Sequence, residues 1–164
     1  MNETGLVAFA GLVSDASDPA NNGRGLFIAD SASSVAAAVR EGQAVSGGDT
    51  LAAFGRPSLN EVGDVAFYAL FTDDPEGTLA RENVGLYRQT ATGLIEIARE
   101  GQAAPNGDGQ FDLPQFLTST TPNFSLRPMF NDIGQVAFLA NLVETVASST
   151  NDKAIYLFLR RRVA

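Results

Sequence analysis

The same eight-residue motif occurs three times in this sequence. Its copies begin at Asn2, Asn60 and Asn131, and each reads Asn, an acidic residue, any residue, Gly, any residue and then Val-Ala-Phe. A chain that repeats itself at intervals of several dozen residues is typically built from one supersecondary unit used in tandem. We therefore expect a tandem-repeat fold in which the motif fixes geometry that every unit needs.

Each copy of the motif predicts a tight turn followed by a strand. Asn favours the first position of a β-turn, and Gly tolerates the positive φ that closes such a turn. The strand that follows is apolar on both faces, most clearly over 65–71. It should therefore be covered by sheets on both sides, with the motif Val and Phe sealed between them. The residues expected to have this structural role are Asn2, Gly5, Phe9, Asn60, Gly63, Phe67, Asn131, Gly134 and Phe138.

Other landmarks follow the motif in a constant order. A short apolar run comes next, then an Arg-Glu-Gly-Gln-Ala segment that begins at Arg40 or Arg99, and then an Arg-Pro pair before the next motif. The whole chain, residues 1–164, is expected to be a single all-β repeat domain. The landmarks divide this domain into units 1–55, 56–126 and 127–164.

Each complete unit should contain four antiparallel strands, which makes about ten strands in the chain. Residues 33–40 could instead form an Ala-rich helix, but their counterpart over 94–99 alternates like a strand, so we expect strands at both places. Four strands per unit indicate an all-β fold of tandem propeller-blade-like units, of which about two and a half are present. A two-sheet β-sandwich is the alternative. One insertion, within 105–123, lengthens the second unit.

Composition excludes several kinds of chemistry. The chain has no Cys and no His, so disulfides, thiolate metal sites and histidine bases are absent. A Ser nucleophile would lack its usual base, and the protein is therefore not expected to be an enzyme. An acid/base hydrolase or lyase that uses carboxylates on a polysaccharide is kept as an alternative. The net charge of −8 disfavours nucleic-acid binding.

Acidic residues gather in the segments that follow the first two motif strands and in the insertion. Clustered carboxylates can bind Ca²⁺, which takes about six to eight oxygen ligands. The candidates are Asp15, Asp18, Asp73, Asp74 and Asp108. None of them lies in an EF-hand or nonapeptide pattern. Solvated loops are therefore the simpler interpretation, and no other cofactor is expected.

No segment of the sequence predicts a membrane span or a signal peptide. The apolar stretch over 154–159 is much shorter than the roughly 20 residues that a span needs. Residues 1–4 are polar and contain no basic residue. We therefore expect neither a membrane span nor a signal peptide in this chain.

The three motif copies resemble the bacterial NxxGxxAF tandem-repeat family, whose choice-of-anchor members carry one of several C-terminal anchors. The core at 131–138, followed by an Ile-Tyr pair at 155–156, is also similar to the repeats of TolB-type propellers. The first resemblance covers essentially the whole chain. It implies a secreted or cell-surface location, and it brings no established activity or catalytic residues.

The recurring residues specify shape rather than chemistry, so the leading hypothesis is a non-catalytic structural or interaction module. Blade-like units that leave sheet edges open predict that neighbouring units come from other chains, as a homo-oligomer or a head-to-tail assembly, or from a longer parent protein. The alternative is a glycan- or peptide-binding module that uses its loops, with or without Ca²⁺. The aromatic residues considered for such a surface are Tyr68, Tyr87, Phe111, Phe116 and Phe124, of which the last three could instead form a small local core.

Overall fold

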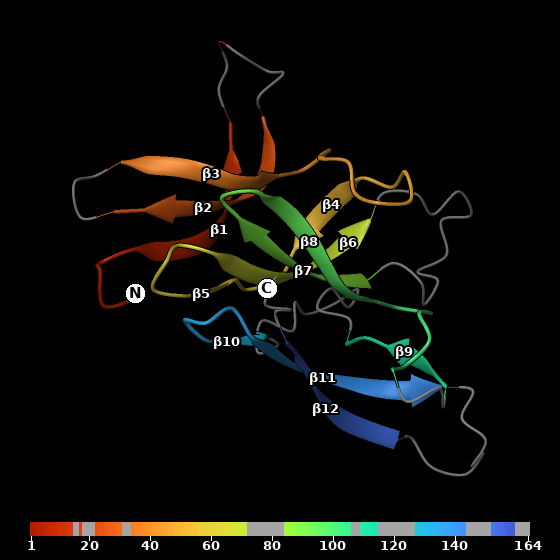
Figure 1. The fold of residues 1–164 in the computed structure, drawn as a ribbon. Coiled ribbons are helices and arrows are strands. Elements are labelled where there is room, and N and C mark those ends of the chain that lie inside the picture. Colours follow the sequence, from red (N-terminus) through yellow and green to blue (C-terminus); the bar gives the residue numbers. More distant parts are fainter. Residues whose placement is uncertain are drawn as a thin grey trace.

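A computed structural model of the chain describes residues 1–14, 17, 22–30, 34–71, 84–105, 109–114, 127–143 and 152–159. All regular secondary structure in these ranges is β-strand, which confirms the all-β prediction. The strands form three antiparallel sheets, and none of the three closes on itself (Figure 1). In the ranges given above, no helix occurs that could cross a lipid bilayer.

The three sheets follow one another along the chain. Sheet 1 contains β1 (Val7–Val13), β2 (Gly23–Ala29) and β3 (Val35–Arg40). Sheet 2 contains β4 (Leu51–Phe54), β5 (Ser58–Leu59), β6 (Val65–Phe71), β7 (Val84–Thr90) and β8 (Gly93–Arg99). Sheet 3 contains β9 (Gln110–Asp112), β10 (Met129–Phe130), β11 (Val136–Val143) and β12 (Asp152–Phe158). The segment that was ambiguous between helix and strand is therefore a strand, β3, as is its counterpart β8.

Sheets 2 and 3 share one plan, in which the first strand is divided into two short segments. β4 and β5 both pair with β6, and β9 and β10 both pair with β11. Pro57 lies between β4 and β5, and Pro128 lies between β9 and β10. Proline has no N–H to donate to a ladder, so pairing is interrupted there. The described residues therefore hold twelve strand segments where about ten strands were expected.

The sheets begin earlier in the sequence than the repeat units. β4 and β9 each precede an Arg-Pro pair in the sequence, yet they pair with the motif strand that follows this pair. The chain crosses between sheets at two similar turns. Gly42 N–H donates to Leu51 O at 2.8 Å, and Gly101 N–H donates to Phe111 O at 2.9 Å. Arg56 follows closely after Leu51, whereas Arg127 comes much later in the sequence after Phe111. Most of the insertion therefore lies after β9.

The motif strands have the same register in every sheet. Each motif Phe pairs with an aromatic residue of the next strand, and the two rings are stacked. The pairs are Phe9 with Phe27, Phe67 with Tyr87 and Phe138 with Tyr156, with centroids 5.7, 6.1 and 5.6 Å apart. The three motif strands therefore fold alike.

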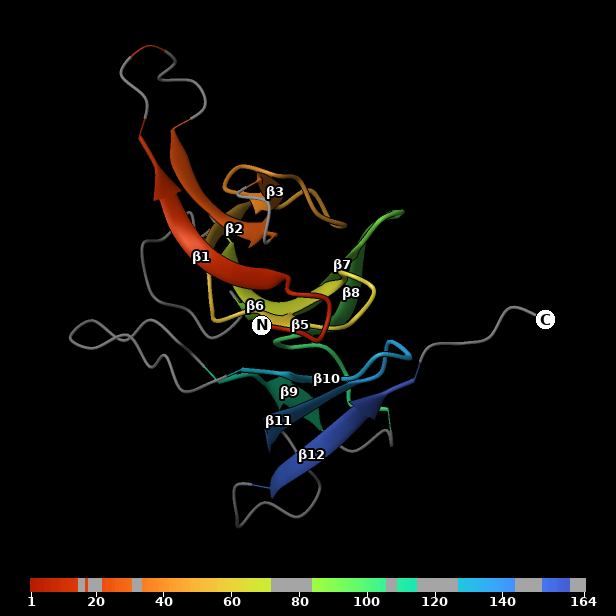
Figure 2. The same cartoon turned by 90° about the vertical axis from the view of Figure 1, so that its left-hand side faces the viewer.

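Sheet 2 lies between sheets 1 and 3 (Figure 2). The face of each sheet that carries the motif Val and Phe is called here the Val-Phe face, and the opposite face, which carries the motif Ala, the Ala face. The Val-Phe face of sheet 2, with Val65 and Phe67, packs on the Ala face of sheet 1, with Leu26 and Val39. Sheets 1 and 2 therefore meet through unlike faces.

The second junction repeats the first. The Val-Phe face of sheet 3, with Val136 and Phe138, packs on the Ala face of sheet 2, with Ala66 and Tyr68. The motif strand of sheet 2 is thus covered on both sides, as its apolar alternation predicted. Three layered sheets differ from the two-sheet sandwich that was the alternative.

The outermost faces of the stack are not covered in the same way. Phe67 and Phe138 are 0% and 6% exposed, but Phe9 is 38% exposed. The expectation that every motif Phe would be sealed is therefore wrong for Phe9, because no described sheet lies over the Val-Phe face of sheet 1. Exposed apolar side chains occupy this face at Val7, Phe9 and Val35, and the Ala face of sheet 3 at Leu139, Ile155 and Leu157.

Candidate functional site

The turn of each motif is built from the same bonds. The C=O of the Asn accepts the N–H of the Gly three residues later, at 3.1–3.3 Å. The Oδ1 of the same Asn accepts the N–H of the residue after this Gly, at 2.8 Å. The three glycines, Gly5, Gly63 and Gly134, have φ of 85°, 87° and 84°, in the left-handed region that favours glycine.

The three turns also hydrogen-bond to one another, and we call this arrangement the turn ladder. Asn2 Nδ2 donates to Asn60 O at 3.0 Å, and Asn60 Nδ2 donates to Asn131 O at 3.5 Å. In addition, Glu3 N–H donates to a carboxylate oxygen of Glu61 at 2.8 Å, and Glu61 N–H to one of Asp132 at 2.9 Å. Two rungs of the same kind therefore join units 1 and 2 and units 2 and 3.

The turn ladder explains why the second motif position is acidic in the second and third copies. A β-turn does not need a carboxylate at its second position, but the ladder needs one to accept the N–H of the preceding turn. Sequence reasoning assigned the motif to turn geometry alone and missed this role. The signal was present, since an acidic residue recurs where turn geometry leaves the choice open.

The turn ladder has a direction. The first and second turns each donate to the next turn through the Asn amide and the N–H of the acidic residue, and the second and third turns accept these bonds through the Asn C=O and the carboxylate. Among the described residues, the Glu3 carboxylate accepts no hydrogen bond and the Asp132 N–H donates none, while Asn131 Nδ2 donates within its own turn to Gln135 Oε1 at 2.8 Å. The turn at Asn2 thus keeps acceptors that no other described turn uses, and we call it the accepting end. The turn at Asn131 keeps the corresponding donors, and we call it the donating end.

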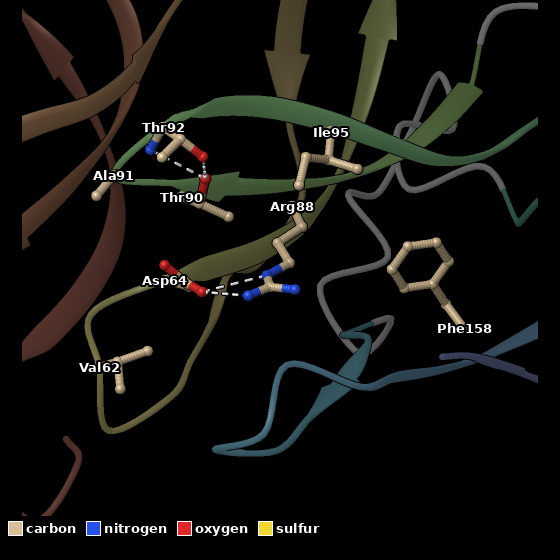
Figure 3. A pocket seen from close by; sticks show the side chains of 8 residues that line it. All are labelled: Val62, Asp64, Arg88, Thr90, Ala91, Thr92, Ile95 and Phe158. Carbon is tan, nitrogen blue, oxygen red and sulfur yellow. Dashed lines mark hydrogen bonds and ion pairs between the residues drawn. The ribbon is translucent and has the colours of Figure 1, made fainter. Parts of the chain in front are cut away.

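A buried ion pair supports the ladder between sheets 2 and 3 (Figure 3). Arg88 on β7 donates from Nε to Asp64 at 3.2 Å and from Nη1 to Gly134 O at 3.1 Å. Its guanidinium also lies over the Phe130 ring, 5.5 Å from the centroid. Arg88 and Asp64 are both buried, so Arg88 clamps the third turn onto sheet 2.

The corresponding place between sheets 1 and 2 is apolar. Leu6, which takes the position of Asp64 in the first motif, has its Cδ1 3.7 Å from where a Cβ on Gly63 would lie. A Cβ on Gly134 would lie 2.7 Å from Nη1 of Arg88. The side chains of one unit therefore pack over the motif Gly of the next unit at both junctions, with different chemistry.

A pocket of about 570 Å³ lies beside the ion pair (Figure 3). Besides Arg88 and Asp64, it is lined by Val62, Thr90, Ala91, Thr92, Ile95 and Phe158. The hydroxyls of the two threonines hydrogen-bond to each other at 3.0 Å. The opposite charges of Arg88 and Asp64 pair with each other at the wall of this pocket.

The loop between β3 and β4 adds polar contacts between units 1 and 2. Asp49 in this loop forms an ion pair with Arg99 of β8, and Ser46 donates to Glu96 at 3.2 Å. Partial burial works against the charge of Arg99, but the hydrogen bond and the charge of Asp49 outweigh it and raise the pKa of Arg99. Burial, reinforced by Glu96, raises the pKa of Tyr87. These groups are therefore engaged in holding the units together.

The residues considered for ligand binding are either buried or undescribed. Tyr68 and Tyr87 are buried between the sheets, which corrects their treatment as exposed aromatic residues. Phe111 is also buried in a core cluster, in agreement with the core alternative that was kept for it. Phe116 and Phe124 lie outside the described residues. The calcium candidates Asp15, Asp18, Asp73, Asp74 and Asp108 also lie outside them. Within the described ranges, no three metal-binding side chains of the His, Cys, Asp or Glu type gather at one place.

Comparison with known proteins places the chain in a family defined by its sequence. No curated protein and no solved structure matches it. The sequence model of a family of unknown function, DUF7453, matches residues 1–159, which is nearly the whole chain. The repeats, the layered sheets and the turn ladder described above are therefore features of a member of the DUF7453 family.

Proposed function

We propose that this protein is a non-catalytic structural module that assembles by stacking propeller-blade-like units, first within the chain and then between chains. The observation that carries the proposal is the repetition of one junction. The same two ladder bonds and the same pair of unlike faces join units 1 and 2 and units 2 and 3. A surface that is used twice within one chain is suited to further use between chains.

The charges of the described residues support a structural role. Asp64 pairs with Arg88, Asp49 pairs with Arg99, and Glu96 accepts the hydroxyl of Tyr87 at 3.0 Å. Each of these pairs joins strands or units. Catalysis by acid and base needs groups that face a substrate, whereas these groups face one another.

The resemblance of the motif to the NxxGxxAF repeats supports a place outside the cell or at its surface. In that setting, a module without cysteine derives its stability from its sheets and their junctions rather than from disulfides. Self-association fits this setting, because it covers apolar faces that would otherwise contact other proteins.

The mass of the protein in solution tests the proposal. Sedimentation equilibrium over a wide range of protein concentration should give a weight-average mass that rises above that of a single chain. A chain that stays monomeric at the highest concentrations reached would contradict the proposed function.

A further inference from the structure

We infer that the partner is a second copy of this chain, docked head to tail. The Ala face of sheet 3 of one copy packs on the Val-Phe face of sheet 1 of the next, and the turn ladder continues from Asn131 and Asp132 to Asn2 and Glu3. This inference rests on the proposed function, which requires only that copies associate. It adds which surfaces meet, in which orientation, and with which hydrogen bonds.

The first argument is the pairing of faces. Both junctions within the chain bring a Val-Phe face onto an Ala face. The two uncovered faces are one of each kind, with Phe9 38% exposed on sheet 1 and Ile155 79% exposed on sheet 3. The two free faces are therefore complements of each other. Two copies of one face would instead place Phe against Phe or Ile against Ile, a contact that the chain does not use.

The second argument is the direction of the turn ladder. The donating end, at Asn131 and Asp132, belongs to the unit with the free Ala face, and the accepting end, at Asn2 and Glu3, to the unit with the free Val-Phe face. Docking the two faces in the orientation used within the chain brings donors onto acceptors. The faces and the hydrogen bonds, which are independent features, thus select the same arrangement.

The third argument concerns the motif glycine. At each internal junction a side chain of one unit lies over the motif Gly of the next, Leu6 over Gly63 and Arg88 over Gly134. In the third motif Gln135 holds the position of Leu6. Gly5 of the next copy has a φ of 85°, so its backbone has the same conformation as Gly63 and Gly134 and offers a motif Gly to the same kind of contact.

Contacts of this kind are heterologous, so they either close into a ring or continue as a filament. The described part of each copy contributes three sheets. A ring of two copies would hold six, which is within the range of about four to eight blades that propellers use.

Cross-linking between defined positions tests the orientation, and the absence of native cysteine gives a clean background. Two single variants, Glu3→Cys and Asp132→Cys, are mixed and treated with a short bis-maleimide. The mixture should give a cross-linked dimer that contains one chain of each kind, whereas each variant alone should give little. The double variant Glu61→Cys/Asp132→Cys is the matched control, because the same contact occurs there within one chain.

Charge placed on one face supplies an independent readout. Ile155→Glu should weaken self-association by about tenfold or more, because docking would bury an unpaired carboxylate. Leu12→Glu is the matched control, since Leu12 is 73% exposed but lies on the opposite face of its sheet from Phe9, and it should associate like the parent protein. Both residues are already exposed, so both variants should fold.

The outcomes separate the inference from the proposed function. If the protein associates but the mixture gives no mixed dimer, or a single variant cross-links as well as the mixture, the head-to-tail contact is wrong and the assembly function stands. Equal effects of Ile155→Glu and Leu12→Glu have the same meaning. If the parent protein is monomeric throughout, both are wrong.

Discussion

Asn60 hydrogen-bonds within its own turn and to the turns of both neighbouring units. Its Oδ1 closes its own turn through the Asp64 N–H, its Nδ2 reaches Asn131 in the next turn, and its C=O receives Asn2 from the previous one. The side chain needs an acceptor and a donor at once, which the amide of Asn supplies and a carboxylate does not. Asn at this position is therefore explained by the junction between units as well as by the turn.

Gly134 is expected to be the least replaceable motif glycine. Its φ of 84° strains any L-residue by about 1–2 kcal/mol. In Gly134→Ala the new Cβ would also lie 2.7 Å from Nη1 of Arg88, so the guanidinium, which is buried and paired with Asp64, would have to move. Urea unfolding should show a loss of roughly 3 kcal/mol or more, as expected when a buried ion pair is disturbed.

The matched control for this variant is Gly42→Ala. Gly42 has a similar φ of 80°, but nothing lies within 4 Å of where its Cβ would be. This variant should lose only about 1 kcal/mol, from backbone strain alone. Equal losses for the two variants would mean that Arg88 moves aside without cost.

Tyr68 should make the protein sensitive to alkaline pH. Burial raises the pKa of Tyr68 to about 12, while the same group in the unfolded chain keeps its ordinary value of 10.0. Above pH 10 the unfolded state therefore loses a proton that the folded state keeps, and stability falls until the pH passes the folded pKa. At pH 11 this loss is about 1.4 kcal/mol from Tyr68.

The measurement is urea unfolding at about pH 8 and pH 11 for the parent protein and for Tyr68→Phe. The difference between the two pH values should be smaller in the variant by about the amount given above, because Phe does not titrate. Tyr87 continues to titrate in both proteins, so part of the alkaline loss should persist. An identical loss in the two proteins would show that Tyr68 does not contribute.

At the scale of elements, the motif strand was more predictable than the strand before it. Apolar alternation on both faces of 65–71 was sufficient to place β6 in a central sheet. The division of the preceding strand into β4 and β5 depends on where Pro57 interrupts pairing, and the sequence pattern did not show that β4 pairs beyond the proline. Short strands on either side of a proline carry too few residues for a periodicity.

The candidate site was predictable only in part, for the same physical reason. The motif indicated local turns, but the partner of each Glu or Asp carboxylate lies in another repeat, and no local pattern reveals it. Tyr68 and Tyr87 were considered as exposed aromatic residues for a binding surface. Their burial follows from the stacking of three sheets, which is a property of the fold rather than of the segments.

The Arg88–Asp64 pair should be replaceable as a pair but not singly. Arg88→Ile leaves Asp64 buried without its partner, and we expect a loss of roughly 3–5 kcal/mol. In Arg88→Ile/Asp64→Leu, the junction takes the residues that sheet 1 has at the equivalent positions, Ile28 and Leu6. Most of the lost stability should return, because apolar packing can replace a buried ion pair.

Chemical denaturation of the single and double variants measures this coupling. A double variant no more stable than Arg88→Ile would show that the ion pair has a role that apolar packing does not fill, such as the bond from Arg88 to Gly134 O.

For the whole molecule, the turn ladder is expected to hold the units together as one cooperative body. Asn60→Ala removes both the turn bond and the rung to Asn131, at a buried position, and should cost roughly 2–3 kcal/mol. Asn131→Ala removes the equivalent turn bond and the bond to the Gln135 side chain, at an exposed position with no further rung among the described residues of one chain. In the single chain it should cost about 1 kcal/mol.

Guanidinium unfolding followed by circular dichroism distinguishes these cases. The slope of the transition should fall in Asn60→Ala if unit 3 begins to unfold separately, because the lost rung joins units 2 and 3, and it should be unchanged in Asn131→Ala. Similar losses and slopes in both variants would assign the Asn to its own turn only.

The one-way order of donors and acceptors gives any chain of copies two chemically different tips. A variant blocked on sheet 3 could still receive a neighbour on sheet 1, and one blocked on sheet 1 could still extend from sheet 3. Each would act as a terminator for growth at one tip only, and their ratio to the parent protein would set the average length. A filament made this way would be polar along its axis, although every subunit is identical.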